Sequence, residues 1–363
     1  MTISLEGLLN KTVDRRWILK SSLYLLSLLN SPIACRGILL ADNLENGSSK
    51  GIFSGPKHIK LLDELVRKYN FSEEYLLGVF EEAELRSEII SRLEKPAEIL
   101  HYYQYRTRFI KDEVISRGRR YLDENLELLN RIESEFGVEK EIILGILGVE
   151  SRFGENSGDY RVFDALNTIF YQYPRREEFF RQEVIEFLLL CREEGIYPLS
   201  VKGSYAGAFG VPQFMPSSFR KFAVDHDNDG KKDLWRSKQD ILASVANYLR
   251  SHRWTKGSPV RISVQADKED PRVKELLSRG LRESVQLGSL DTAHIQVDKN
   301  LADQYQISGQ ETVSIITYQD KENETEKMEI VFSNFKSIIK YNASTNYALT
   351  VTDLARIFSR REA

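Results

Sequence analysis

One carboxylate, Glu150, stands where the sequence predicts an apolar helix face. In residues 138–154, VEKEIILGILGVESRFG, Ile143, Ile146, Leu147 and Glu150 follow the spacing that gathers side chains on one side of a helix. Burial disfavours a charged carboxyl group, so we expect the pKa of Glu150 to rise and the group to hold a proton near neutral pH. General acid catalysis requires such a group. Two non-catalytic interpretations remain open: Glu150 could be buried and held by a structural hydrogen bond, or the helix could be turned so that Glu150 faces water.

Glycines surround this carboxylate. Gly145 and Gly148 each weaken a helix by roughly 1 kcal/mol relative to Ala. Glycines inside a helix usually occur where another group packs closely against the helix. We therefore expect a neighbour to come close to this face. Gly154 is placed to end the helix at the mouth of a cleft.

Polar and aromatic side chains gather in several other segments. These are HYYQYRTRFI (101–110), YPRR (173–176), KGSYAGAFGVPQFMPSS (202–218), NY (247–248) and YNASTNYA (341–348). In the third segment, glycines let the backbone approach a ligand, and the Gln213 amide can donate and accept. Arg175 and Arg176 precede a predicted helix, where the helix dipole favours anions over cations. They could bind an external anion or be two solvated side chains.

An acidic loop predicts a calcium site. Residues 225–236 place oxygen ligands at positions 1, 3, 5 and 9 and a glycine at position 6, the first part of an EF-hand loop. The acidic positions are Asp225, Asp227, Asp229 and Asp233. Position 12 departs from the pattern, because Arg236 replaces the bidentate Glu. Lys231 would contribute its backbone carbonyl, and we expect Ca²⁺ to stabilise the fold.

Length and charge restrict the class of protein. The chain has 363 residues, which suggests two or three domains. Its 51 Lys and Arg against 54 Asp and Glu give a net charge of -3, without the basic excess that tracks a phosphate backbone. Nucleic acid is therefore not an expected partner.

The beginning of the chain has the features of an export signal. RRWILK (15–20) precedes a Leu-rich apolar stretch and the pair Ala34-Cys35. The basic run resembles a twin-arginine signal, and an ordinary secretion signal is the alternative. Lipidation at Cys35 would give a membrane tether, although Pro32 departs from the usual cleavage pattern. We expect a periplasmic protein, with an outer-membrane lipoprotein as one form. We expect Cys191, the other cysteine, to be a small core residue.

GVESRFG, GAFGVPQFMPSS, NY and YNASTNYA resemble, in the same order, the motifs of the membrane-bound lytic murein transglycosylase B family. The resemblance spans residues 57–360, and YRTRFI (105–110) matches a further element. It implies that Glu150 is catalytic, that Ser204 orients Glu150, and that Asp240 closes the calcium loop. Residues implied to contact substrate are Tyr105, Ser151, Arg175, Arg176, Ser204, Gln213, Tyr248, Tyr341, Asn342 and Tyr347, with the two arginines meeting the peptide stem of the cell wall.

The implied fold is α+β and mainly α: a lysozyme-like core, a helical N-terminal domain and a small inserted β-containing domain. We expect an export signal at 1–34, a flexible tether at 35–56, the helical domain at 57–137 and the catalytic core at 138–254. The β-containing domain would span 255–335, and residues 336–363 would return to the core.

The implied activity is non-hydrolytic cleavage of the β-1,4 bond between N-acetylmuramic acid and N-acetylglucosamine in peptidoglycan, with 1,6-anhydromuramyl ends. Glu150 would act first as acid and then as base. A lysozyme-type hydrolase is one alternative; it usually needs a second carboxylate, for which Glu155 and Asp159 are available. A calcium-stabilised scaffold that binds peptidoglycan without cutting it is the other.

Overall fold

The computed structural model of the chain describes residues 55–94, 100–290, 295–297, 303, 305, 307–321 and 326–360. The chain divides into two compact units, Met1–Lys60 and Leu61–Ala363. The described part of the first unit is the start of helix α2 (Pro56–Arg67). The predicted export signal, Cys35 and nearly all of the predicted tether lie outside the described residues. Among the helices that are described, none is long and apolar enough to cross a membrane.

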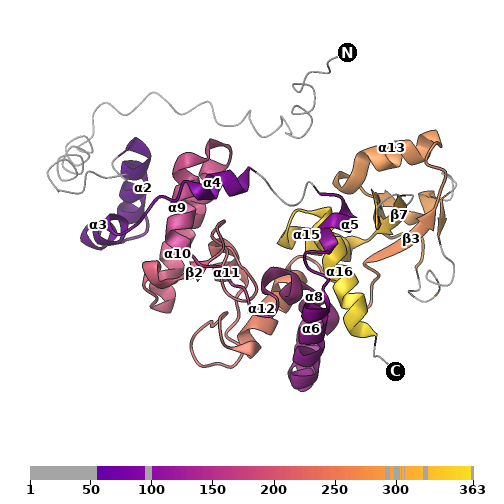
Figure 1. Ribbon diagram of the computed structural model, residues 1–363, viewed down its shortest axis with the longest axis horizontal. Coiled ribbons are helices and arrows are strands. Elements are labelled where there is room, and N and C mark those ends of the chain that lie inside the picture. Colours follow the sequence, from indigo (N-terminus) through magenta and orange to yellow (C-terminus); the bar gives the residue numbers. More distant parts are fainter. Residues whose placement is uncertain are drawn as a thin grey trace, which may run out of the picture. The chain divides into compact units, whose positions relative to one another are not determined.

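Helices dominate the second unit (Figure 1). After α2 they are α3 (Glu73–Glu81), α4 (Glu88–Leu93), α5 (Tyr102–Arg106), α6 (Asp112–Glu124), α7 (Leu126–Phe136), α8 (Lys140–Ser151), α9 (Val162–Gln172), α10 (Glu177–Glu194), α11 (Pro216–Phe222), α12 (Lys238–Ser251), α13 (Pro271–Arg279), α15 (Ser333–Tyr341) and α16 (Thr345–Ser359), with short 3-10 turns such as η4 (Pro174–Arg176) and η5 (Pro198–Ser200).

The strands form two antiparallel sheets. β1 (Tyr160–Arg161) pairs with β2 (Lys202–Gly203). The larger sheet has the order β4-β6-β7-β3-β5, formed by β3 (Arg261–Gln265), β4 (Val285–Gln286), β5 (Gln296–Val297), β6 (Thr312–Tyr318) and β7 (Lys327–Val331). Ile330 of β7 faces both Ile262 and Ile315 in register. These residues and Val273 of α13 belong to a hydrophobic cluster of this sheet, so the β-rich part has a core of its own.

Helices α8 and α16 form the packing unit that matters most for the site, and Figure 1 shows them side by side. Every α8 residue from Ile142 to Val149 is buried. A Cβ on Gly145 would come within 2.5 Å of the Val351 carbonyl oxygen in α16, and one on Gly148 would lie 3.3 Å from Leu354. The close neighbour expected at these glycines is therefore a second helix, whose backbone approaches where side chains are absent.

A buried ionic cluster joins α16 to the larger sheet. Arg261 of β3 donates to Thr352 Oγ1 of α16 (2.8 Å) and to Glu329 Oε2 of β7 (2.7 Å), and it also pairs with Asp353. Buried charges of this kind are tolerated only when they are paired. The sheet thereby holds the helix whose N-terminal turn carries Tyr347.

The mainly helical α+β class expected from the sequence is confirmed. The helical region before α8 contains a break between α6 and α7. Asn125 separates α6 from α7, and its side-chain amide donates to the Tyr121 carbonyl at 2.7 Å. Asn competes in this way for the backbone groups that a continuous helix would use. Cys191 is a buried free thiol in α10, as expected of a core residue.

Candidate active site

Glu150 lies in the last turn of α8 and is half-buried. Its Oε1 accepts a hydrogen bond from the hydroxyl of Tyr347, 2.6 Å away in α16. Burial raises the pKa of Glu150 to about 7, and the bond from Tyr347 opposes that rise. The predicted shift is confirmed, and its cause is the expected loss of hydration. A carboxyl group with this pKa can both donate and accept a proton near neutral pH.

The backbone just after Glu150 turns sharply. Helix α8 ends at Ser151, whose hydroxyl accepts the Gly154 N–H at 3.0 Å. Arg152 and Phe153 then take positive φ values of 52° and 61°, followed by Gly154 at 89°. The helix therefore ends earlier than the glycine predicted. Left-handed conformations at two non-glycine residues are strained and are found most often at functional sites.

Three tyrosines back the carboxylate. The rings of Tyr347 and Tyr341 stack with centroids 6.3 Å apart, and Tyr248 lies 4.7 Å from Tyr341. Tyr341 donates to the Pro212 carbonyl (2.6 Å) and Tyr248 to that of Lys340 (2.5 Å). Burial, and then the charge of Glu150, raise the pKa of Tyr341 and Tyr347 well above the ordinary value. All three phenols therefore remain protonated donors that hold the wall behind Glu150.

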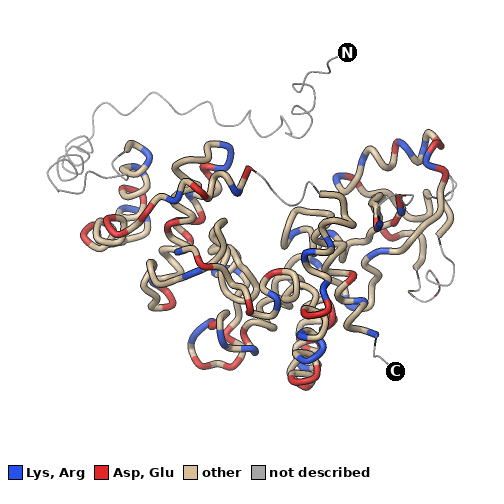
Figure 2. Tube along the Cα trace, in the orientation of Figure 1, with Lys and Arg blue, Asp and Glu red and all other residues tan. Residues whose placement is uncertain are grey.

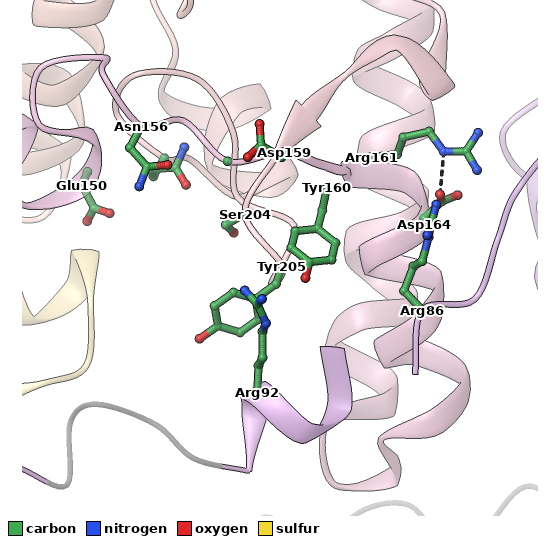
Figure 3. A pocket seen from close by; sticks show the side chains of 12 residues that line it. Arg86, Arg92, Glu150, Asn156, Asp159, Tyr160, Arg161, Asp164, Ser204 and Tyr205 are labelled. Carbon is green, nitrogen blue, oxygen red and sulfur yellow. Dashed lines mark hydrogen bonds and ion pairs between the residues drawn. The ribbon is translucent and has the colours of Figure 1, made fainter. Parts of the chain in front are cut away.

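Glu150 opens into a cleft of about 760 Å³. Figure 3 shows Glu150 at one end and the Arg161–Asp164 ion pair at the other. The lining residues are Arg86, Arg92, Glu150, Asn156, Gly158, Asp159, Tyr160, Arg161, Asp164, Ser204, Tyr205 and Gln213. The cleft thus combines the Glu150 carboxyl group with aromatic and amide side chains, a composition suited to a carbohydrate with hydroxyl and amide groups.

The glycine-rich segment supplies one wall of the cleft. Ser204 Oγ accepts the N–H groups of Ala206 (3.3 Å) and Ala208 (3.1 Å), so its proton remains to be donated. Gln213 has a φ of 50°, and its Nε2 donates to the carbonyls of Ser157 (3.1 Å) and Gly210 (2.8 Å). These bonds fix the amide and leave its oxygen as an acceptor. Both side chains share the cleft with Glu150, as the sequence predicted.

Other predicted contact residues lie outside this lining. Arg175 and Arg176 are exposed, and the Arg176 guanidinium lies over the rings of Phe179 and Phe180 at 4.5 and 5.1 Å. Tyr105 is buried with its ring 5.0 Å from Phe109. Ser151, Tyr248, Tyr341, Asn342 and Tyr347 are likewise not among the lining residues, although the tyrosines cluster behind Glu150. Substrate contact by these residues stays a prediction.

Several cleft residues have no counterpart in the sequence predictions. Arg92 of α4 lies over the Tyr160 ring at 5.5 Å, and Arg86 precedes the same helix. The segment before α4 is held against α9, because Asp164 accepts the Glu84 N–H (3.0 Å) and Thr168 accepts that of Arg86 (2.9 Å). No local sequence pattern predicts that Arg86 and Arg92 line the cleft. A search of the residues next to the motifs could have found Tyr205, inside the glycine-rich segment, and Asn156, two residues after Gly154.

The two carboxylates considered for a hydrolase differ in position. Glu155 is exposed and accepts a hydrogen bond of 2.7 Å from Arg117, which lowers its pKa. Asp159 lines the cleft, and Figure 3 shows its carboxylate pointing to a different side from that of Glu150. Asp159 is therefore the stronger candidate for a second carboxylate.

The acidic loop between α11 and α12 brings three carboxylates together. Ligand oxygens of Asp225, Asp227 and Asp229 lie within 4.8 Å of one another. Asp225 accepts the N–H groups of Asp229 (3.1 Å) and Gly230 (2.9 Å), and Gly230 has a φ of 89°. Three negative charges at this separation repel one another unless a cation offsets them. The residues present therefore fit a hard divalent cation such as Ca²⁺.

Asp240 closes this loop through hydrogen bonds. It is fully buried in the first turn of α12, and its two oxygens accept the N–H groups of His226 (2.8 Å) and Asp233 (2.9 Å). Asp233 Oδ1 accepts those of Trp235 and Arg236, each at 2.9 Å. A carboxylate oxygen has a second lone pair for a metal, so direct ligation by Asp233 and Asp240 stays a prediction.

Known proteins resemble this chain along most of its length. Residues 55–356 match the family described as the transglycosylase SLT domain. The chain is 32% identical over 313 residues to membrane-bound lytic murein transglycosylase B of Escherichia coli strain K12, covering 84% of this chain and 82% of that protein. The crystal structure of soluble lytic transglycosylase SltB1 from Pseudomonas aeruginosa has a TM-score of 0.76 at 38% identity, over 83% of this chain and 97% of that one. The E. coli lytic transglycosylase Slt35 in complex with calcium has a TM-score of 0.75 at 32% identity, over 85% and 95%.

Proposed function

The chain belongs to the lytic transglycosylases of the transglycosylase SLT domain family, and from that premise we propose that Glu150 is the catalytic acid and base of a peptidoglycan-cleaving enzyme. The observation that carries this assignment is the half-buried carboxyl group with a pKa of about 7, held by Tyr347 at the end of the cleft. The reaction is lytic transglycosylation of peptidoglycan.

Protonated Glu150 donates its proton to the glycosidic oxygen between N-acetylmuramic acid and N-acetylglucosamine, and that bond breaks. The resulting carboxylate accepts the proton of the muramyl 6-hydroxyl while this oxygen closes on C1. The product is a 1,6-anhydromuramyl end, and the enzyme recovers its proton. A pKa near 7 suits both halves of this sequence, because neither protonation state is strongly disfavoured.

Gln213 would bind the sugar beside Glu150. Ser204 would orient the Glu150 carboxyl group together with Tyr347, which donates a hydrogen bond to it. Ser151 fixes the helix end, and Tyr105, Tyr248, Tyr341 and Asn342 would complete the aromatic wall. Arg175 and Arg176 would meet parts of the peptide stem that extend beyond the cleft. The support for these roles is their placement around Glu150 and their match to the motifs of the family.

Calcium would be held by Asp225, Asp227 and Asp229 with the carbonyl of Lys231, supported by Asp233 and Asp240. Its contribution is structural, because it would offset carboxylates that otherwise repel. An Slt35 structure contains calcium, which agrees with this proposal. The N-terminal features favour a periplasmic protein, with a lipid tether at Cys35 as one form, and the E. coli relative is membrane-bound by name.

The test combines one substitution with analysis of the products. Glu150→Gln keeps the shape of the side chain and removes the proton donor, so it should fold, bind glycan and lose turnover by about 10²–10⁴-fold or more. The unmutated protein should release muramyl ends that are lighter by one water than lysozyme products and unlabelled in heavy-oxygen water. Mass spectrometry of digested peptidoglycan measures both properties.

Two other outcomes would contradict the proposal. Muramyl ends that carry solvent oxygen would assign a hydrolase, with Asp159 as the first residue to test as its second carboxylate. An unmutated protein that binds glycan and gives no product would be a peptidoglycan-binding scaffold.

A further inference from the structure

A second groove, of about 650 Å³, adjoins the cleft. Gly158 lines both. Ser157 lines the groove, and its carbonyl accepts a hydrogen bond from the cleft residue Gln213, so the wall between the two belongs to the proposed active site. The groove runs between the end of α10, strand β2 and the second half of the acidic loop. Its charged lining residues are Glu194, Lys202, Lys231, Lys232, Asp233 and Arg236.

The two carboxylates of this groove already have partners. The Asp233 carboxylate accepts the backbone N–H groups of Trp235 and Arg236 at its Oδ1. The backbone N–H of Asp233 itself donates to Oδ2 of Asp240. Glu194 accepts the Lys232 N–H at 3.3 Å and lies 3.9 Å from its ammonium group. Lys202, Lys231 and Arg236 are exposed and form no ion pair within the part of the chain that the structure describes. Four basic residues of the groove lining, Lys202, Lys231, Lys232 and Arg236, face two acidic ones, Glu194 and Asp233, so the groove has an excess of two positive charges.

We infer that this groove binds the carboxylates of the peptide stem attached to a glycan strand in the cleft, an inference that rests on the proposed function. The stem is a short peptide bearing several carboxylates, and it is covalently joined to the muramyl sugar. Once the glycan occupies the cleft, the stem is held at high effective concentration beside the groove, so weak contacts suffice. Arg236 offers a planar fork for a carboxylate, and the two lysines offer point charges.

Figure 2 shows acidic and basic residues interspersed along most elements, so net charge alone does not direct a stem to this groove. The position of the groove directs the stem there, because the groove shares Gly158 with the cleft and Ser157 is hydrogen-bonded to Gln213. The exposed pair Arg175 and Arg176 lines neither the cleft nor this groove. The groove thus gives the enzyme a means to prefer strands that still carry their peptides.

The experiment compares two substrates: glycan strands with stem peptides, and the same strands after an amidase has removed the peptides. The measured quantity is the ratio of kcat/KM for the first substrate to that for the second. The full chain should prefer peptide-bearing strands. Lys202→Gln/Arg236→Gln should lower the ratio about five-fold, because two exposed ionic contacts are lost. High salt should lower the ratio in the unmutated chain as well.

Lys221→Gln/Arg250→Gln is the matched control, since it removes two exposed charges from α11 and α12 outside the groove. It should leave the ratio unchanged. An equal ratio in the groove variant and the unmutated chain, or a loss in Arg175→Gln/Arg176→Gln instead, would overturn the inference. If the groove double variant does not fold, each single variant of these exposed residues gives the same comparison. Failure of the proposed function looks different, because the unmutated chain would then cleave neither substrate by transglycosylation.

Discussion

At the scale of single residues, two opposed effects set the protonation of Glu150. Burial favours its neutral form, and the Tyr347 hydroxyl favours the carboxylate by donating to it. Burial is the larger effect, so the pKa remains near 7. Deleting the Tyr347 hydroxyl group removes the second effect alone, so an experiment can measure how much each effect contributes to the pKa of Glu150.

Tyr347→Phe should raise the pKa of Glu150 further, because it removes the hydrogen bond that stabilises the carboxylate. The general acid would then keep its proton to higher pH. From the pKa of Glu150 we expect an alkaline limb of the kcat/KM profile near pH 7 in the unmutated enzyme, and we expect this limb to move to higher pH in Tyr347→Phe. The rate itself should fall, since Glu150 loses the group that orients it.

Tyr341→Phe is the control for this shift. Tyr341 stacks beside Tyr347, but its hydroxyl donates to Pro212. Its loss should leave the alkaline limb in place whatever it does to KM. Equal shifts in both variants, or a shift of Tyr347→Phe to lower pH, would refute the assigned balance.

At the scale of secondary-structure elements, the contact between α8 and α16 joins the acid to its orienting tyrosine. Gly145 is the point of closest approach, where an added Cβ would lie 2.5 Å from a backbone oxygen. A backbone atom cannot rotate away as a side chain can. The two helices would have to separate, and the bond between Tyr347 and Glu150 would lengthen with them.

Gly145→Ala should therefore destabilise the protein by about 1–3 kcal/mol despite the better helix propensity of Ala. It should also reduce activity. Gly78→Ala in α3 is the control, because nothing lies within 4 Å of the added atom, and we expect it to stabilise by about 0.5–1 kcal/mol. Denaturant titration measures both. A neutral Gly145→Ala would show that α16 is not closely packed there.

The sequence predicted the secondary-structure elements better than the tertiary contacts between them. Helical periodicity located α8, and the helix predicted after Arg175 and Arg176 is α10. The glycines of α8 indicated a close neighbour, but the neighbour is about two hundred residues away in the chain. Arg86 and Arg92 were missed for the same reason: what brings them to the cleft is the attachment of their segment to α9, a tertiary contact without a local pattern. Motif resemblance identified Glu150, Ser204 and Gln213, whereas Arg175 and Arg176 lie outside the cleft lining.

At the scale of the whole molecule, the acidic loop ties α11, α12 and the groove into one unit. Asp240 is buried beneath it and bonds to the backbone at two points. A cation among Asp225, Asp227 and Asp229 would hold the exposed part of the loop in the same arrangement. The loop's stability should then depend on calcium concentration.

Calcium at a hundred times its Kd should stabilise the folded state by about 2.7 kcal/mol by mass action. For a chain of this size we expect a rise in Tm of about 5 °C. A chelator should reverse the rise. The variant Asp225→Asn/Asp229→Asn should have the same Tm in calcium and in chelator. If calorimetry finds that the Tm of the unmutated protein does not depend on calcium, the site is refuted.

The burial of Glu150 also has a thermodynamic consequence for the fold. Its pKa is about 7 in the folded protein against an ordinary value of 4.5, so the unfolded chain releases this proton first. Below pH 4.5 the group is neutral in both states and costs nothing. Between these two values the free energy of unfolding should decrease as pH rises, and above pH 7 the loss should reach about 2–3 kcal/mol. Glu150→Gln should therefore be more stable than the unmutated enzyme at pH 8 and equally stable at pH 4 in denaturant titrations. Equal differences at both pH values would contradict the shift; the expected result would mean that the proton donor weakens the very structure that positions it.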